Sequence, residues 1–148
     1  METTARPALP RLGAIAVVLH QGKVLLVRRK NPPDAGLWGF PGGHVDAGET
    51  ALDAAARELA EETGVIGRPV RYLTNLDIIL HDPAGELQFH FLLAVVLCDY
   101  VSGTPVAADD VSDAGWIAVT DLASLPTSAD VDRIIALAYS TTPTIGPI

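Results

Sequence analysis

The sequence has one cysteine, few aromatic residues and no long hydrophobic run. Cys98 is the single cysteine among 148 residues, which excludes an internal disulfide. It lies in the apolar segment 89–98, and we interpret it as a small buried residue in a reducing compartment rather than a reactive thiol. That segment is too short for a membrane-spanning helix of roughly 18–20 residues. The first 12 residues have two arginines without an apolar core behind them, unlike a signal peptide. We therefore expect a cytoplasmic protein with no membrane partner.

Basic residues are also scarce. The chain has 10 Lys and Arg against 18 Asp and Glu, which gives a net charge of −8 and a pI near 4.7. Nucleic-acid backbones are bound by basic surfaces, so we expect no nucleic-acid partner. If so acidic a protein binds a phosphate-bearing ligand, positive charge has to be supplied locally. Bound divalent cations are the natural source.

What the sequence has in quantity is aliphatic side chains. Hydrophobic residues make up 49% of the chain, which favours a folded protein over a disordered one. A length of 148 residues fits one domain with one substantial core. We therefore predict a single domain over residues 1–148, in which residues 1–10 and 141–148 are loose tails.

Hydrophobic periodicity and turn residues predict an irregular alternation of strands and helices. Gln21-Gly22 reads as a tight turn between two strands, and the two prolines at 32 and 33 force a loop. The predicted strands cover residues 12–19, 23–29, 70–80, 87–100 and 116–119, and the predicted helices cover 50–62 and 129–139. This order favours an α/β (α+β) fold with a mixed sheet and helices packed on its faces.

The first predicted helix concentrates negative charge on one side. Thr50 is its expected N-cap and Gly64 its expected end. At about 100° per residue, Glu58, Glu61 and Glu62 fall within about a third of the circumference. The residues expected to pack on the core from another side are Leu52, Ala55, Ala56, Leu59 and Thr63. Clustered carboxylates repel one another unless they share a cation. A Glu-rich stretch alone is more often a solvated face, so the surrounding pattern decides.

That surrounding pattern is specific. Residues 43–65 read GHVDAGETALDAAARELAEETGV. In this stretch Gly43 precedes Glu49 by six positions, Arg57-Glu58 and Glu61-Glu62 follow at fixed spacing, and Gly64 with an aliphatic residue closes it. Every defining position of the Nudix box is filled, and average residue frequencies put a chance match at about 10⁻⁷. Residues 37–42 resemble the segment that leads into the box. The chain is therefore similar to Nudix (MutT-like) hydrolases, which implies a Nudix α/β/α sandwich with a mixed central sheet.

The resemblance also implies roles for residues of the box. It implies that Mg²⁺ or Mn²⁺ is bound by Glu58 and Glu62, with Glu61 as a third ligand, directly or through water, and the carbonyl of Gly42 as a backbone ligand. Arg57, paired with Glu49, would orient the ligand carboxylates. The residues implied to be catalytic are Glu62, Glu61, Arg57 and Glu49.

Two parts of the site stay open at this point. The general base is either Glu62 or a metal-bound water without a separate protein base, and the alternatives on the loop 107–113 are Asp109, Asp110 and Asp113. The candidate substrate contacts are Arg28 and Arg29 for phosphate and Trp38 and Phe40 for a base. An exposed strand end would explain the arginines equally well, and core packing would explain the aromatic residues.

The implied activity is hydrolysis of a diphosphate bond by attack of Mg²⁺-activated water on phosphorus. We favour a nucleoside diphosphate linked to another moiety, such as ADP-ribose. The alternative substrate is a nucleoside triphosphate, oxidised nucleotides included. A catalytically silent nucleotide-binding regulatory module is a third interpretation, although such modules usually have eroded box glutamates and none is eroded here. The expected partner is a small nucleotide-type substrate, and a homodimer is one assembly to test.

Overall fold

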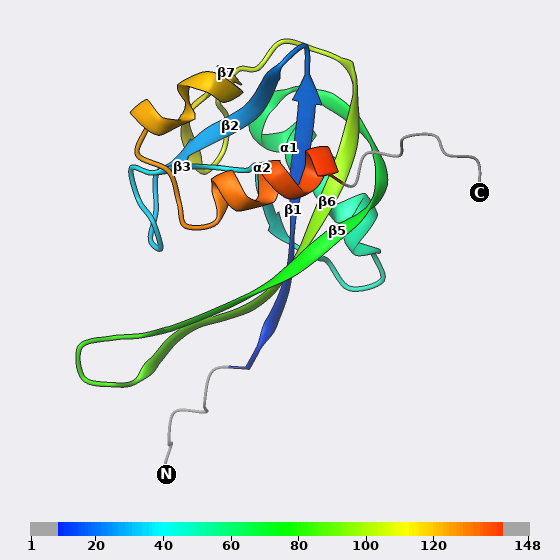
Figure 1. Ribbon diagram of the computed structural model, residues 1–148. Coiled ribbons are helices and arrows are strands. Elements are labelled where there is room, and N and C mark those ends of the chain that lie inside the picture. Colours follow the sequence, from blue (N-terminus) through cyan, green and yellow to red (C-terminus); the bar gives the residue numbers. More distant parts are fainter. Residues whose placement is uncertain (1–8, 141–148) are drawn as a thin grey trace.

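The computed structural model describes residues 9–140, which form a sheet with helices on both faces (Figure 1). The predicted tail residues 1–8 and 141–148 lie outside the described residues, and Leu9 and Pro10 have no regular secondary structure. The elements are β1 Arg11–His20, β2 Lys23–Arg29, β3 Trp38–Gly39, β4 Gly42–His44, α1 Ala51–Thr63, β5 Ile66–His81, β6 Leu87–Ser102, β7 Val111–Ala118, the 3-10 helix η1 Val119–Ser124 and α2 Val131–Ser140. No helix of this part of the chain is both long and apolar enough to cross a membrane.

The sheet is mixed, as predicted. Its strands follow the order β3-β2-β1-β6-β5, with β4 paired to β1 and β7 paired to β2. Strands β1 and β6 run parallel, whereas β5 and β6 are antiparallel. The predicted fold class, a mixed central sheet flanked by helices, is confirmed.

Alternating side chains of β1 build a core on each face of the sheet. Ala14, Ala16 and Val18 point to one face, where they pack in a cluster with Ala55 and Leu59 of α1. Val17 points to the other face, where the cluster contains the buried residues of α2. Figure 1 accordingly shows α2 in front of β1 and α1 behind it. Strand β1 is therefore buried on both sides, which explains its continuous apolar sequence.

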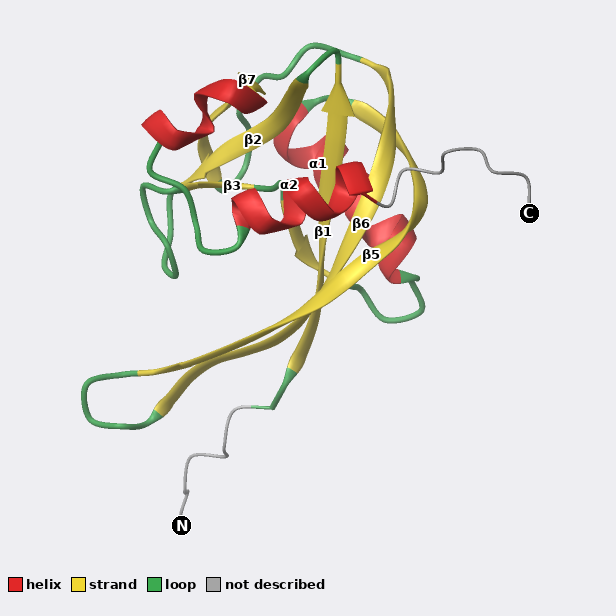
Figure 2. Cartoon of the chain, in the orientation of Figure 1, coloured by secondary structure: helices red, strands yellow, loops and turns green. Residues whose placement is uncertain are grey.

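The two longest strands form a hairpin that extends past the rest of the sheet. Strands β5 and β6 have 16 residues each. Because β1 pairs with β6 only from Phe91 onward, residues 87–90 and the facing part of β5 continue beyond β1. Figure 2 shows this projection as two yellow strands joined by a green loop. Both strands are longer than the predicted 70–80 and 87–100.

Other element boundaries also differ from the sequence predictions. Strand β7 begins five residues before the predicted strand 116–119, and Val119 belongs to η1. The cause is pairing with β2 along its whole length, from Lys23↔Ala118 to Arg29↔Val111, which overrides the polar composition of residues 112–113. Helix α2 begins two residues after the predicted start because Asp130 has a φ of 74°, a left-handed conformation outside a helix. The short strands β3 and β4 were not predicted, and two or three residues carry no readable periodicity.

Candidate metal and substrate site

Helix α1 presents the acidic residues of the site. It begins where the Thr50 hydroxyl oxygen accepts a hydrogen bond from the Asp53 amide at 3.0 Å, and it ends at Gly64, whose φ is 76°. Both predicted ends are therefore confirmed. The buried residues of the helix are Ala54, Ala55, Leu59, Glu62 and Thr63, so the predicted core positions Ala55, Leu59 and Thr63 are confirmed and Ala54 was missed. Leu52 is half-buried and packs against the same core cluster, as predicted, whereas Ala56 is half-buried.

Glu62 is the most unusual of these residues because it is a carboxylate with only 6% of its surface exposed. Its position, seven residues after Ala55 and three after Leu59, places it at the border of the apolar face. Burial raises the pKa of Glu62 to about 7, against an opposing contribution from the Gly42 amide. That amide donates to Glu62 Oε1 at 3.1 Å. Nearby Glu58 and Asp110 raise the pKa further, whereas Arg29 lowers it.

Glu58 lies one turn before Glu62 and is also partly enclosed. Burial raises its pKa as well, opposed by the hydrogen bond and charge of Arg57. The backbone of Gly43 lies directly against this carboxylate, and a Cβ at position 43 would overlap the Glu58 oxygens. A side chain at Gly42 would likewise overlap the carbonyl oxygen of Ala14. Glycine is required at both positions because the backbone passes so close to its neighbours.

Arg57 connects the loop before α1 to the carboxylates on it. Its guanidinium donates to both Glu49 oxygens, at 2.8 and 2.9 Å, and to the carbonyl oxygen of His44 at 2.9 Å. Its Nη1 atom donates to Glu58 Oε2 at 3.2 Å and to Glu61 Oε1 at 3.1 Å. The hydrogen bonds from Arg57 lower the pKa of Glu49 to about 2, and the same pair raises the pKa of Arg57.

The predicted ion pair between Arg57 and Glu49 is present, and Asp46 of the same loop lies 3.5 Å from the guanidinium. The two-pronged bond to Glu49 holds the guanidinium beside this loop.

The donor set suits a hard divalent cation. Within residues 9–140 no three His, Cys, Asp or Glu side chains converge on one point, since Arg57 holds Glu58 and Glu61 while the Gly42 amide holds Glu62. The partly enclosed carboxylates of Glu58 and Glu62 nevertheless lie one helical turn apart, and burial raises the pKa of each. Oxygen donors are what Mg²⁺ and Mn²⁺ bind, and a shared cation would relieve both the burial cost and the repulsion. The residues present therefore fit such an ion.

A cavity of about 400 Å³ opens beside these carboxylates. Four candidate site residues from the sequence line it: Arg29, Phe40, Gly42 and Asp110. Gly43, the first residue of the box, lines it as well. Arg29 is held in place because its Nε donates to the carbonyl of Pro33 at 2.7 Å. A cavity of this size is within the usual range for small-molecule sites.

Other candidates from the sequence lie elsewhere. Arg28 is exposed and donates to the Gly36 carbonyl at 3.1 Å, while Trp38 packs partly buried against the core on the α2 side. The Asp113 carboxylate accepts from the Ala114 amide at 2.9 Å within β7, and the carbonyl of Asp109 accepts from Lys30 at 2.9 Å. Of the three aspartates considered as a base, Asp110 is therefore the one that lines the cavity.

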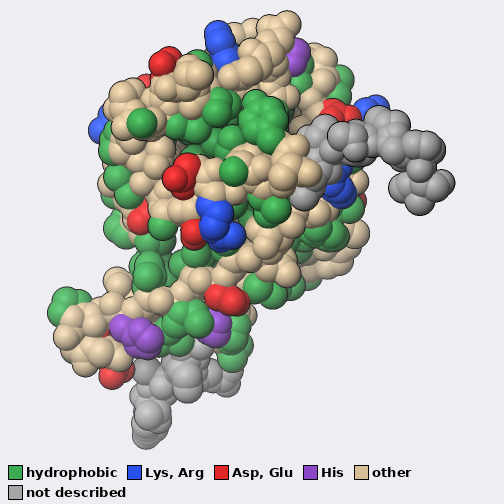
Figure 3. Space-filling model, in the orientation of Figure 1, with side chains coloured by type: hydrophobic (Ala, Val, Ile, Leu, Met, Phe, Trp, Pro, Cys, Tyr) green, Lys and Arg blue, Asp and Glu red, His purple; other side chains and the backbone are tan. Residues whose placement is uncertain are grey.

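The sequence prediction missed most of the cavity wall. One side is apolar and comes from the projecting hairpin: Leu76, Ile78, Phe89, Phe91 and Leu93. The alternation of Phe89, Phe91 and Leu93 indicates a common face, but only the fold shows that this face borders the cavity. The opposite side is polar and includes Asn31, Asp34, Ser128 and Asp130. Arg and Lys side chains (blue) are scattered over the face drawn in Figure 3, without a continuous basic surface.

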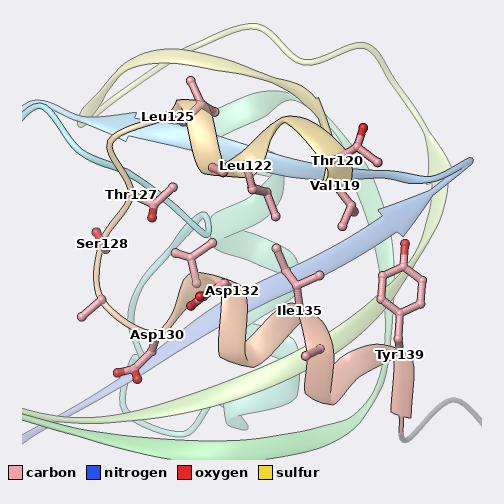
Figure 4. Close-up of a pocket in the computed structure, with 14 residues that line it drawn as sticks. Val119, Thr120, Leu122, Leu125, Thr127, Ser128, Asp130, Asp132, Ile135 and Tyr139 are labelled. Carbon is pink, nitrogen blue, oxygen red and sulfur yellow. The ribbon is translucent and has the colours of Figure 1, made fainter.

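A second hollow, of about 670 Å³, lies between η1 and α2. Figure 4 shows Ile135 and Tyr139 of α2 on the side that faces Leu122 and Val119 of η1. Its lining contains Asp130 and Asp132 but no Arg, Lys or His. Nothing in this lining would neutralise a phosphate, whereas the cavity beside Glu58 and Glu62 is lined by Arg29.

A mixed sheet with helices on both faces, and two partly enclosed carboxylates beside a cavity, defines an α/β/α protein with oxygen donors that suit a divalent cation. The NUDIX domain family matches residues 9–138. The ADP-ribose pyrophosphatase of Methanocaldococcus jannaschii is 35% identical over 127 residues, which cover 85% of this chain and 71% of that protein. The chain belongs to the Nudix family, whose members are hydrolases that generally use divalent metals and act on small nucleotide-type substrates.

Two solved structures are similar to the whole fold. The MutT NUDIX hydrolase from Burkholderia pseudomallei is 32% identical, with a TM-score of 0.75, and the match covers 88% of this chain and 98% of that one. The NUDIX domain of Shewanella oneidensis NrtR, solved in complex with ADP ribose, is 27% identical, with a TM-score of 0.68, and the match covers 92% and 89%.

Proposed function

We propose that this chain hydrolyses the diphosphate linkage of a nucleoside diphosphate joined to another moiety, with ADP-ribose as the favoured substrate. The observation that carries the proposal is the pair of partly enclosed carboxylates, Glu58 and Glu62, which contact the Gly42-Gly43 wall of a cavity that Arg29 also lines. The relative from Methanocaldococcus jannaschii that is called an ADP-ribose pyrophosphatase and the NrtR domain bound to ADP ribose support the choice of substrate.

In this proposal Glu58 and Glu62 hold Mg²⁺ or Mn²⁺, together with Glu61 and the carbonyl of Gly42. When bound, such an ion supplies Lewis-acid activation of a phosphoryl group and of water. Arg57 and Glu49 keep the carboxylates oriented, because the guanidinium contacts Glu49, Glu58 and Glu61 at once. Arg29 binds a phosphoryl oxygen, a role that arginine fills well. Neither Arg28 nor Trp38 has a part in it.

The proposed reaction is a substitution at phosphorus. The oxygen of water forms a bond to one phosphorus, and the bond from that phosphorus to the bridging oxygen breaks. The other phosphoryl group leaves with the bridging oxygen, and the proton of the water passes to Glu62 and from there to solvent. Glu62 is ionised when it holds the cation, and an ionised carboxylate can accept a proton. Asp110 lines the same cavity and is the alternative base.

Incubation with a panel of nucleotides and Mg²⁺, with products identified by mass, tests the proposal. ADP-ribose should give AMP and ribose 5-phosphate. Pyrophosphate and a nucleoside monophosphate from triphosphates, with ADP-ribose untouched, would move the substrate to the alternative class and keep the chemistry. No hydrolysis of any diphosphate or triphosphate would overturn the proposal.

Three expectations from the sequence stay predictions alongside this function: one domain over the whole chain, a cytoplasmic location and a homodimer. The exposed apolar side chains of the edge strand β5, which include Ile66, Val70 and Tyr72, support a second copy binding there. Light scattering after gel filtration measures the assembly, and a mass of about 15.5 kDa would exclude the dimer.

A further inference from the structure

His44 is a residue of the cavity that the box pattern leaves unassigned. It ends β4, directly after Gly43, and its carbonyl oxygen accepts a hydrogen bond from Arg57 at 2.9 Å. Its ring meets the ring of Phe91 edge-on, with centroids 5.4 Å apart and an interplanar angle of 64°. The backbone is thus fixed by Arg57 and the ring is supported by the apolar wall of the hairpin. The side chain itself is exposed and lines the cavity.

His44 and Arg29 lie toward different carboxylates of the pair. The Gly43 backbone lies against Glu58, which places the adjacent His44 at the Glu58 end. Arg29 ends β2 beside the loop that contacts Glu62: the Lys30 amide donates to the Asp110 carbonyl at 3.1 Å, and the Ala108 amide donates to the Glu62 carbonyl at 3.0 Å. Glu58 and Glu62 are one helical turn apart, about 6 Å along the axis.

The composition of the cavity adds to this arrangement. Of all the residues that line it, Arg29 and His44 are the two that can carry positive charge, whereas Asp34, Asp110 and Asp130 carry negative charge. A diphosphate has two phosphoryl groups with charge on each. Each basic side chain can therefore hold one phosphoryl group. In a substrate bound in the reverse orientation, each phosphoryl group would lie against the other basic side chain.

We propose that His44 donates a hydrogen bond to one phosphoryl group while Arg29 holds the other, so that His44 decides which phosphorus takes up water. This proposal rests on the proposed diphosphate hydrolysis. It makes His44 a substrate contact that fixes the position of the breaking bond, in addition to any contribution to affinity. The P–O bond that forms and the bridging bond that breaks are those described above, and His44 selects between the two chemically possible phosphorus atoms.

Hydrolysis of ADP-ribose in ¹⁸O-enriched water with Mg²⁺ tests the selection. In the unsubstituted protein the label should appear in one product only, either AMP or ribose 5-phosphate. In His44→Ala the label should appear in both products, with kcat/KM about tenfold lower, the scale for a hydrogen bond to a charged group. His44→Gln keeps an N–H donor and should retain a single labelled product. His81→Ala, an exposed histidine at the end of β5 outside the cavity, is the matched control and should behave as the unsubstituted protein.

Binding of α,β-methylene-ADP, which resists hydrolysis, gives a second readout by calorimetry in the presence of Mg²⁺. His44→Ala should weaken binding about tenfold and His81→Ala should not. Circular dichroism and thermal unfolding check that each variant is folded. If His44→Ala is not folded, His44→Asn replaces it, because the shorter side chain does not reach the phosphate. Label in one unchanged product and unchanged affinity in the His44 variant would overturn the inference, as would label in both products of the unsubstituted protein. If the protein cleaves no diphosphate at all, the proposed function fails, and the binding measurement still decides whether His44 contacts the diphosphate.

Discussion

The buried carboxyl group of Glu62 makes the stability of the metal-free protein depend on pH. Its pKa is about 7 in the folded protein against an ordinary value of 4.5, and only 6% of the residue is exposed. A group whose pKa is raised by folding contributes stability that is fully present below pH 4.5 and is lost as the pH rises through 7. At about 1.4 kcal/mol for each pH unit between these two values, the loss amounts to about 3.5 kcal/mol. Glu58, whose pKa is also raised, acts in the same direction.

The substitution Glu62→Gln isolates this contribution. Glutamine keeps the shape and an oxygen that can accept from the Gly42 amide, but it does not titrate. Urea unfolding in a chelator at pH 5, 6, 7 and 8 should show the free energy of unfolding of the unsubstituted protein falling by about 2.5 kcal/mol across this range relative to Glu62→Gln. Glu86→Gln, which removes an exposed carboxylate at the tip of the hairpin, is the control and should leave the pH profile unchanged. If the free energy of unfolding varied with pH in the same way in the unsubstituted protein and in Glu62→Gln, the raised pKa of a buried Glu62 would be refuted.

Three further outcomes follow from the same site. Chelation of divalent cations, or Glu62→Gln in folded protein, should lower turnover by at least about two orders of magnitude, and turnover that survives both would contradict a metal mechanism. Glu58→Gln should leave the metal-free protein as stable as before, or more stable by a few tenths of a kcal/mol, while weakening Mg²⁺ binding in calorimetry; a large loss of stability would identify Glu58 as a structural partner of Arg57. Glu49→Gln should weaken metal affinity by roughly 10–100-fold, because Arg57 loses its charged partner and no longer orients Glu58 and Glu61, and unchanged affinity would show that this orientation is not needed.

Local signals in the sequence were sufficient for the parts of the fold that local chemistry determines. The hydroxyl of Thr50 and the left-handed Gly64 set the ends of α1 as predicted, because both act within one turn of the chain. The pairing of Arg57 with Glu49 was available from the box pattern. By contrast, β7 extends to Val111 because it pairs with β2, a partner about 80 residues away along the chain, and no local pattern reports such pairing.

The cavity was the part that the sequence could not supply. Phe91 lies 47 residues after His44, and their contact depends on the way β6 passes β4. The same holds for Asp110, which local composition could not separate from Asp109 and Asp113. The burial of Glu62 could in principle be predicted, because it follows Ala55 by seven residues, but the prediction grouped it with Glu58 and Glu61 on one acidic side of the helix, apart from the core face.

In the proposed reaction, water attacks phosphorus beside Glu58 and Glu62 with the help of a divalent cation. Hydrolysis of ADP-ribose in ¹⁸O-enriched water, followed by mass spectrometry of the products with and without a chelator, tests this reaction. We expect AMP and ribose 5-phosphate with ¹⁸O on a phosphate group, and no products once the cation is removed. Label in a sugar hydroxyl, or cleavage that continues unchanged in the chelator, would contradict it.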